Sequence, residues 1–190
     1  WFWRGWFYTT QNVDMGIKEV QKLYITDNAT KEGKEFLERY GADPEEIDAV
    51  YVVKEDSEDF DESLKGKSVL ENSPTIKEYV MDNFSEDERA KLKDPKYFYQ
   101  VIFEKPGGIP MPLIVEFTYA DGSTEMKRYP VQLWRMNDEV ATKAIATNKE
   151  ITKIVVDPDL ETADVDVSNN TWPKEETTNK FEEFKENLGN

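Results

Sequence analysis

Oxygen-bearing side chains recur near the C-terminal end of this 190-residue sequence in a pattern that could hold a cation. They match the first, third, fifth, seventh and twelfth positions of a calcium-binding EF-hand loop, and they are Asp164, Asp166, Ser168, Asn170 and Glu175. The sixth position is Asn169, where the sharp turn of such a loop requires Gly, and Trp172 and Pro173 interrupt its end. We therefore interpret the stretch as a solvated acidic turn and keep a calcium loop as the alternative.

Other candidate sites give weaker signals. Asp157, Asp159 and Glu161 form a second acidic group, which is a poorer calcium candidate than the first. In a chain with 40 acidic residues, neighbouring carboxylates do not by themselves indicate a glycosidase, whose two carboxylates must flank the bond to be cleaved. Trp134 could line a ligand groove, but a Trp in a strand-like segment more often packs in the core.

The sequence contains no histidine and no cysteine. Without histidine the chain can form neither a Ser-His-Asp triad nor an H-E-x-x-H zinc site. Without cysteine it can form no disulfide, thiolate nucleophile or Cys-ligated zinc site. We therefore predict that this chain has no catalytic, metal-binding or cofactor-binding residues and is not an enzyme by itself.

The net charge of −16 argues against two classes of partner. Nucleic-acid backbones and anionic membrane surfaces both attract clustered Lys and Arg, whereas this chain has 24 basic residues against 40 acidic ones. No segment reaches the roughly 20 apolar residues that a membrane-spanning helix needs. We expect no nucleic-acid partner and no membrane span.

The chain opens on an aromatic run, WFWRGWFY, without an initiator Met. We interpret residue 1 as a cut inside a longer polypeptide. Side chains this apolar must pack on something, and we expect them to cover the sandwich predicted below or an upstream domain. A sugar- or peptide-binding platform is the alternative. The residues concerned are Trp1, Phe2, Trp3, Trp6 and Phe7.

Residues 13–95 are polar and acidic, and they carry local helix signals. Residues 31–40 place apolar side chains at helical spacing before a Gly, residues 43–46 resemble a helix start with a first-turn Pro, and residues 85–88 form a capping box. The acidic run 55–62 is predicted to be a loop. The stretch has few apolar residues, so we expect short helices that lie over another surface and have no hydrophobic core of their own.

From residue 96 to about 157 the apolar residues recur with a period of two, which is typical of β-strands. Asp121 and Gly122 predict a tight hairpin turn, because this pair readily adopts positive φ angles. Turn signals every 8 to 12 residues, with no helix between them, predict an antiparallel immunoglobulin-like β-sandwich. The predicted strands are 97–104, 113–119, 124–129, 131–136, 140–146 and 151–156.

These patterns divide the chain into four stretches. They are a junction at 1–12, an acidic arm with short helices at 13–95, the β-sandwich at 96–170 and a C-terminal tail at 171–190. In the tail, Phe181, Phe184 and Leu188 share one face of a possible helix. The fold class expected is therefore mainly β, preceded by a short-helix arm.

The opening sequence WFWRGWFYTT resembles a junction in aminopeptidase-N-like zinc metallopeptidases (gluzincins) of Bacteroidetes-type bacteria, where it follows the catalytic domain. Further stretches resemble the same C-terminal region in the same order. They are FEKPGG (103–108) with MPLI (111–114), EFTY (116–119) through DG (121–122), and DP (157–158) with ETAD (161–164) and SNN (168–170).

The resemblance implies that this chain is a non-catalytic structural or docking domain of a secreted, periplasmic or cell-envelope aminopeptidase. Zinc is expected in the catalytic domain of the parent protein, and that upstream domain is the expected partner. No catalytic or zinc-binding position of the family has a counterpart in this sequence. The alternative is an independent cell-envelope module that binds carbohydrate, peptide or calcium.

Overall fold

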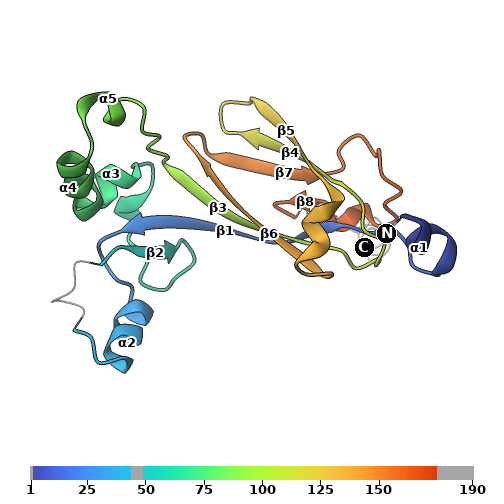
Figure 1. Cartoon of the computed structure of the whole chain (residues 1–190), viewed down its shortest axis with the longest axis horizontal. Helices are drawn as coiled ribbons and strands as arrows, with labels where there is room; N and C mark the ends of the chain where they lie inside the picture. Colours follow the sequence, from blue (N-terminus) through green and yellow to red (C-terminus); the bar gives the residue numbers. More distant parts are fainter. Residues whose placement is uncertain (1, 44–48, 175–190) are drawn as a thin grey trace, which may run out of the picture.

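The computed structural model describes residues 2–43 and 49–174, which form a mainly β protein with two antiparallel four-stranded sheets (Figure 1). The first sheet has the order β2-β1-β3-β6 and the second the order β5-β4-β7-β8. The strands of the first sheet are β1 (Gly16–Thr26), β2 (Tyr51–Lys54), β3 (Tyr97–Glu104) and β6 (Val140–Thr147). Those of the second are β4 (Leu113–Tyr119), β5 (Thr124–Tyr129), β7 (Ile151–Val156) and β8 (Thr171–Trp172).

The two sheets share one hydrophobic core, as the strands of a β-sandwich do. Alternate residues of β3 and β4 face inward and are almost fully buried, including Val101 and Phe103 opposite Val115 and Phe117. Burying each such side chain stabilises the fold by about 1.5–3 kcal/mol. The predicted period-two strands are therefore confirmed for 97–104, 113–119, 124–129, 140–146 and 151–156.

A hydrogen bond also joins the sheets inside this core. The Tyr99 hydroxyl of β3 accepts the backbone N–H of Ile151 at the start of β7, at 2.8 Å. Burial raises the pKa of Tyr99 above its ordinary value, so the phenol stays neutral. The bond satisfies a backbone donor that the core would otherwise leave unpaired.

One strand prediction is wrong. Residues 131–136 form the 3₁₀ helix η2 (Val131–Arg135) instead of a strand. Pro130 precedes it with φ −70° and has no backbone N–H, so it cannot extend the ladder of β5. The helical turn places Trp134 in the core, where its Nε1–H donates to the Met111 carbonyl at 3.0 Å.

Residues 13–95 contribute more than short helices, because they supply β1 and β2 to the first sheet. A bulge between Ile17 and Glu19 shifts the inward face of β1 by one residue. The strand buries Ile17 before the bulge but Tyr24 and Thr26 after it. This change of phase removes the regular alternation that would have revealed an 11-residue strand.

The helices of this stretch gather beyond the far ends of β1 and β3 (Figure 1). The predictions for 31–40 and 85–88 are confirmed, and residues 55–61 contain turns and irregular backbone, as expected for a loop. Residues 44–48, which carry most of the helix start predicted at 43–46, lie outside the described residues, as does the possible helix of the tail. The helices are α2 (Lys31–Arg39), η1 (Glu62–Leu64), α3 (Val69–Asn72), α4 (Pro74–Asn83) and α5 (Glu86–Arg89).

The expectation that 13–95 has no core of its own is wrong. Tyr24, Val53 and Leu64 form a small buried cluster, with Tyr51 and Phe60 packed against it. Burial and the nearby carboxylate of Glu55 raise the pKa of Tyr24 to about 12. The far end of the first sheet is thus held by a second, smaller apolar cluster.

The loop after β7 contains a strained residue that offers a first test of the structure. Leu160 is 67% exposed and has φ 52°, a conformation that costs a non-Gly residue about 1 kcal/mol. We expect Leu160→Asn to raise the free energy of unfolding by about 0.5–1 kcal/mol, because Asn tolerates this conformation better. Leu160→Ala keeps the strain and should change little. Urea unfolding midpoints measure both, and equal effects of Asn and Ala would contradict the assignment.

Candidate functional site

Helix α1 (Phe2–Tyr8) lies at one end of the molecule, and α3, α4 and α5 lie at the other end (Figure 1). Gly5 of α1 is buried and lies next to Ile109 of the β3–β4 loop. A Cβ at Gly5 would stand 3.1 Å from Cγ2 of Ile109, so the absence of a side chain lets the helix approach closely. The Thr9 hydroxyl donates to the Gly5 carbonyl at 2.8 Å and closes the helix. The helix is thereby seated on the sandwich through its smallest residue.

Four aromatic side chains of α1 are exposed. Trp3 is 68% exposed, Trp6 41%, Phe7 64% and Tyr8 82%, and the rings of Trp3 and Phe7 stack with centroids 5.2 Å apart. We call these four residues the aromatic face of α1. Contiguous exposed apolar side chains mark interaction surfaces, and Trp and Tyr are the residues that most often dominate binding energy. Trp1 lies outside the described residues.

A cleft of about 820 Å³ opens beside the aromatic face. Phe7 and Tyr8 line one side, and Gly108, Pro110 and Asp138 line the other. A shallower hollow of about 340 Å³ continues from Pro110 and Asp138 to η2. The aromatic face and these two hollows form a continuous surface across this end of the sandwich.

The β3–β4 loop fixes the segment that carries α1. Backbone hydrogen bonds join the loop to this segment. The Asn12 N–H donates to the Gly107 carbonyl at 3.1 Å, and the Ile109 N–H donates to the Asn12 carbonyl at 3.2 Å. Lys105, whose side chain is 2% exposed, holds the loop from inside. Its ammonium donates to the Gly108 carbonyl at 2.7 Å and lies 3.3 Å from the Asp138 carboxylate. The geometry of the site therefore depends on contacts between residues about a hundred positions apart.

The EF-hand-like pattern does not assemble as a loop of converging ligands. The Asp166 carboxylate accepts the Ser168 N–H at 3.0 Å and the Ser168 hydroxyl at 2.6 Å, and it caps the 3₁₀ helix η3 (Val167–Asn169). These bonds lower the pKa of Asp166. The Asp164 carboxylate likewise accepts bonds from within the turn, from the Asp166 N–H at 3.2 Å and the Asn170 amide at 3.1 Å, and Glu175 lies outside the described residues. The spacing thus reflects a locally capped turn.

The second acidic group is also separated by the structure. Asp157 is buried and accepts hydrogen bonds from Glu161 N–H, Thr162 N–H and the Thr162 hydroxyl, at 2.8, 2.9 and 2.5 Å. Glu161 instead forms a bidentate ion pair with Arg128 at 2.9 and 2.5 Å. Asp159 is exposed to solvent. The predicted core position of Trp134 is confirmed.

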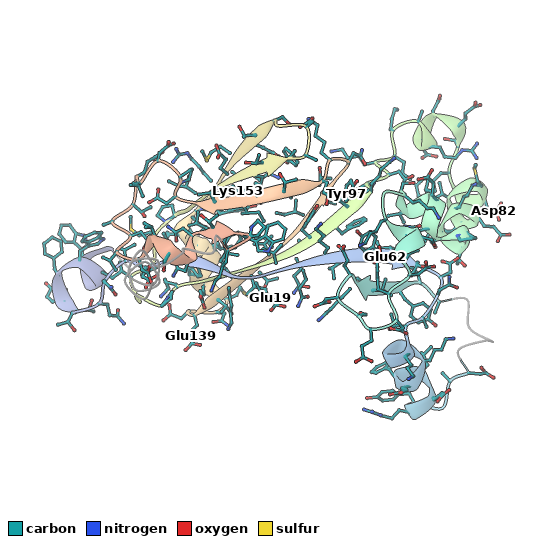
Figure 2. All side chains as sticks on the ribbon, turned by 180° about the vertical axis from the view of Figure 1, so that it is seen from behind. Glu19, Glu62, Asp82, Tyr97, Glu139 and Lys153 are labelled. Carbon is teal, nitrogen blue, oxygen red and sulfur yellow. The ribbon has the colours of Figure 1, made fainter. Side chains whose placement is uncertain are left out.

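Other acidic residues are spread over the surface. Of the acidic residues labelled in Figure 2, Glu19 lies on β1, Glu62 on η1, Asp82 on α4 and Glu139 in the bend before β6, and each is exposed. Within residues 2–43 and 49–174, no group of three or more Asp, Glu, His or Cys side chains is arranged to hold a metal ion. Every helix in the same ranges is too short or too polar to cross a lipid bilayer.

Comparisons with known proteins give no relative for this chain. No family model, curated protein or solved structure matches it. The aromatic end of the sandwich is therefore interpreted from its own geometry.

Proposed function

We propose that this chain is a non-catalytic docking module of a secreted zinc aminopeptidase-like metallopeptidase, and that it binds the catalytic domain of that enzyme through the aromatic face of α1. The observation that carries the proposal is the concentration of four exposed aromatic side chains on one seven-residue helix at the end of the sandwich. Water disfavours such a surface, and covering it with a protein partner would release that free energy.

The contacts between α1 and the sandwich support a docking surface of fixed geometry. Gly5 and the Asn12–Gly107 contacts hold α1 against the sandwich, so little conformational freedom would be lost on binding. The adjoining cleft and hollow extend the surface toward η2, and stable interfaces need about 800 Å² on each partner. An aromatic centre with a more polar surround is the usual anatomy of such an interface.

The choice of partner rests on the sequence resemblance. In the proposed assembly the zinc ligands belong to the catalytic domain, because this chain has no histidine with which to build an H-E-x-x-H site. We also propose that the two sheets form an immunoglobulin-like fold and that the protein lies in the periplasm or the cell envelope. The chain would act by stabilising the catalytic domain and limiting access to it.

A double substitution on α1 tests the docking surface. Trp3→Ala with Phe7→Ala is expected to weaken binding to the zinc-peptidase catalytic domain by about 30-fold or more, because the loss of even one central aromatic residue costs an interface about 2 kcal/mol. Isothermal titration calorimetry with the separately prepared catalytic domain gives the dissociation constants. Both side chains are exposed, so the thermal midpoint of the chain alone should change little.

Helix α2 offers a matched control. Phe36 and Tyr40 have the same spacing as Trp3 and Phe7, their ring centroids are 4.8 Å apart, and they are 58% and 72% exposed. Phe36→Ala with Tyr40→Ala should leave binding within about twofold. If both double variants bind as tightly as the original chain, or if both lose binding equally, α1 is not the docking surface.

The alternative is an independent binding module for a peptide or a carbohydrate. The cleft of about 820 Å³ favours it, because Phe7 and Tyr8 offer ring faces beside polar groups of Thr9, Thr10 and Gln11. Under this alternative the chain alone binds a peptide or oligosaccharide, and Tyr8→Ala removes that binding. Under the docking proposal a library of such ligands gives no saturable binding.

A further inference from the structure

Four strands form the edges of the two sheets, and three of them are built in ways that discourage pairing with another chain. An edge strand presents unpaired backbone N–H and C=O groups, and short length or charged side chains keep other strands away from them. β2 has four residues and β8 has two, so both are short. β5 carries Glu125, Lys127 and Arg128 among its six residues. These three edges therefore offer little to a further strand.

Strand β6 is the exception. Its eight residues, VATKAIAT, include no Pro or Gly, and Lys143 is its only charged residue. β6 pairs with β3 on one side, and on its other side no strand of residues 2–43 and 49–174 pairs with it. Thr142, Ala144 and Ala146 on its outer face are small and exposed, so no bulky side chain shields the edge. A long, nearly neutral edge strand of this kind is a template for strand addition.

Lys143 lies on the inner face of this strand. The register places it opposite Val101 of β3, which is buried in the core, and directly opposite residues share one face of a sheet. Its Nζ lies 5.2 Å from the centroid of the Tyr129 ring, which belongs to β5 at the edge of the other sheet. Lys143 thus reaches from the edge of one sheet to the edge of the other. An inward-pointing charge on an edge strand is a recognised means of preventing strand addition.

A second copy of this chain is the partner that the free edge would take, because identical strands pair antiparallel about a two-fold axis. Pairing of two β6 strands over most of their length places the two Lys143 side chains opposite each other or diagonal to each other on one face. Like charges in that arrangement are destabilising. We propose that Lys143 keeps the free edge of β6 from pairing with β6 of a second copy. The docking proposal is independent of this inference, since no residue of β6 lines the cleft or the hollow beside α1.

Sedimentation velocity over a range of concentrations tests this role. Lys143→Met should associate at concentrations at least about tenfold lower than the original chain, because it removes the like-charge contact and keeps a side chain of similar length. Lys143→Arg keeps the positive charge and should behave as the original chain does. Lys127→Met is the matched control. Lys127 also lies on an inner face, with its Nζ 5.4 Å from the Phe117 ring, but β5 keeps Glu125 and Arg128, so association should not change.

Two further readouts identify the surface and the cause. Hydrogen–deuterium exchange at concentrations where Lys143→Met associates should show added protection in β6 and none in α1. The thermal midpoint of dilute Lys143→Met should equal or exceed that of the original chain, because an apolar side chain replaces an inward-facing charge. The proposal is overturned if Lys143→Met associates no more than the original chain, or if Lys127→Met associates equally, which would point to the change in net charge. It is also overturned if the midpoint falls without association, since Lys143 would then act only through its contact with Tyr129.

Discussion

Replacing Gly107 with alanine is expected to lower the free energy of unfolding by about 3 kcal/mol. A Cβ at this position would lie 2.5 Å from the Asn12 carbonyl oxygen and 2.6 Å from the Asp14 nitrogen. Both are backbone atoms in segments already joined by hydrogen bonds, so neither can rotate away. The added methyl group must therefore separate the β3–β4 loop from the segment that carries α1.

Gly66→Ala is the matched control. Gly66 has φ 75°, but an added Cβ would meet no heavy atom within 4 Å, so the cost should be only the conformational strain, about 1 kcal/mol. Urea unfolding followed by tryptophan fluorescence compares the two variants. Because Gly107→Ala also displaces the segment behind α1, it should weaken partner binding, whereas Gly66→Ala should not. Equal destabilisation by both substitutions would show that the close approach at Gly107 is not as described.

Asp157→Ala is the second substitution with a large expected effect, also about 3 kcal/mol. The buried Asp157 carboxylate accepts three hydrogen bonds from Glu161 and Thr162, and its removal leaves those donors without their acceptor. Alanine must in addition adopt the positive φ of 50° that this position requires. The loop after β7, which also carries Asp164, should lose its protection from hydrogen exchange.

Two further variants separate these causes. Asp157→Asn tolerates the positive φ and keeps one acceptor oxygen, so it should cost less than Asp157→Ala. Asp159→Ala removes an exposed carboxylate two residues away and should stay within about 0.5 kcal/mol of the original chain. Chemical denaturation of the three variants gives the comparison. A cost for Asp159→Ala equal to that for Asp157→Ala would mean that loop charge, and not the buried hydrogen bonds, is responsible.

A regular alternation of inward and outward residues made β3 predictable from the sequence. Tyr99, Val101 and Phe103 are buried while the residues between them are only partly buried. In β4 the same period remains visible in the sequence, although Ile114 is buried as well as Leu113 and Val115. The bulge at Ile17 breaks the same pattern in β1, so the strand could not be recognised. In η2, apolar residues at 131, 133 and 134 suit either a strand or a helical turn, and only the packing of Trp134 decides between them.

Only those parts of the candidate site that come from residues close together in the sequence could be predicted. The aromatic run that forms α1 is visible in the sequence, although the outward direction of Trp3 and Phe7 depends on Gly5 meeting Ile109. The contact between Asn12 and Gly107 joins residues far apart in the sequence, and no spacing rule finds such a pair. The EF-hand-like spacing instead directed attention to Asp166, whose carboxylate is satisfied within its own turn.

The most direct test of the central claim is hydrogen–deuterium exchange of this chain, alone and mixed with the proposed partner, a zinc-peptidase catalytic domain. The docking proposal predicts that the complex forms and that protection increases in α1 and residues 9–11, while α2 exchanges as fast as in the free chain. Protection confined to α2 or to the outer faces of the sheets would contradict the proposal. So would the absence of a complex at concentrations of about 100 μM, well above the dissociation constants of stable interfaces.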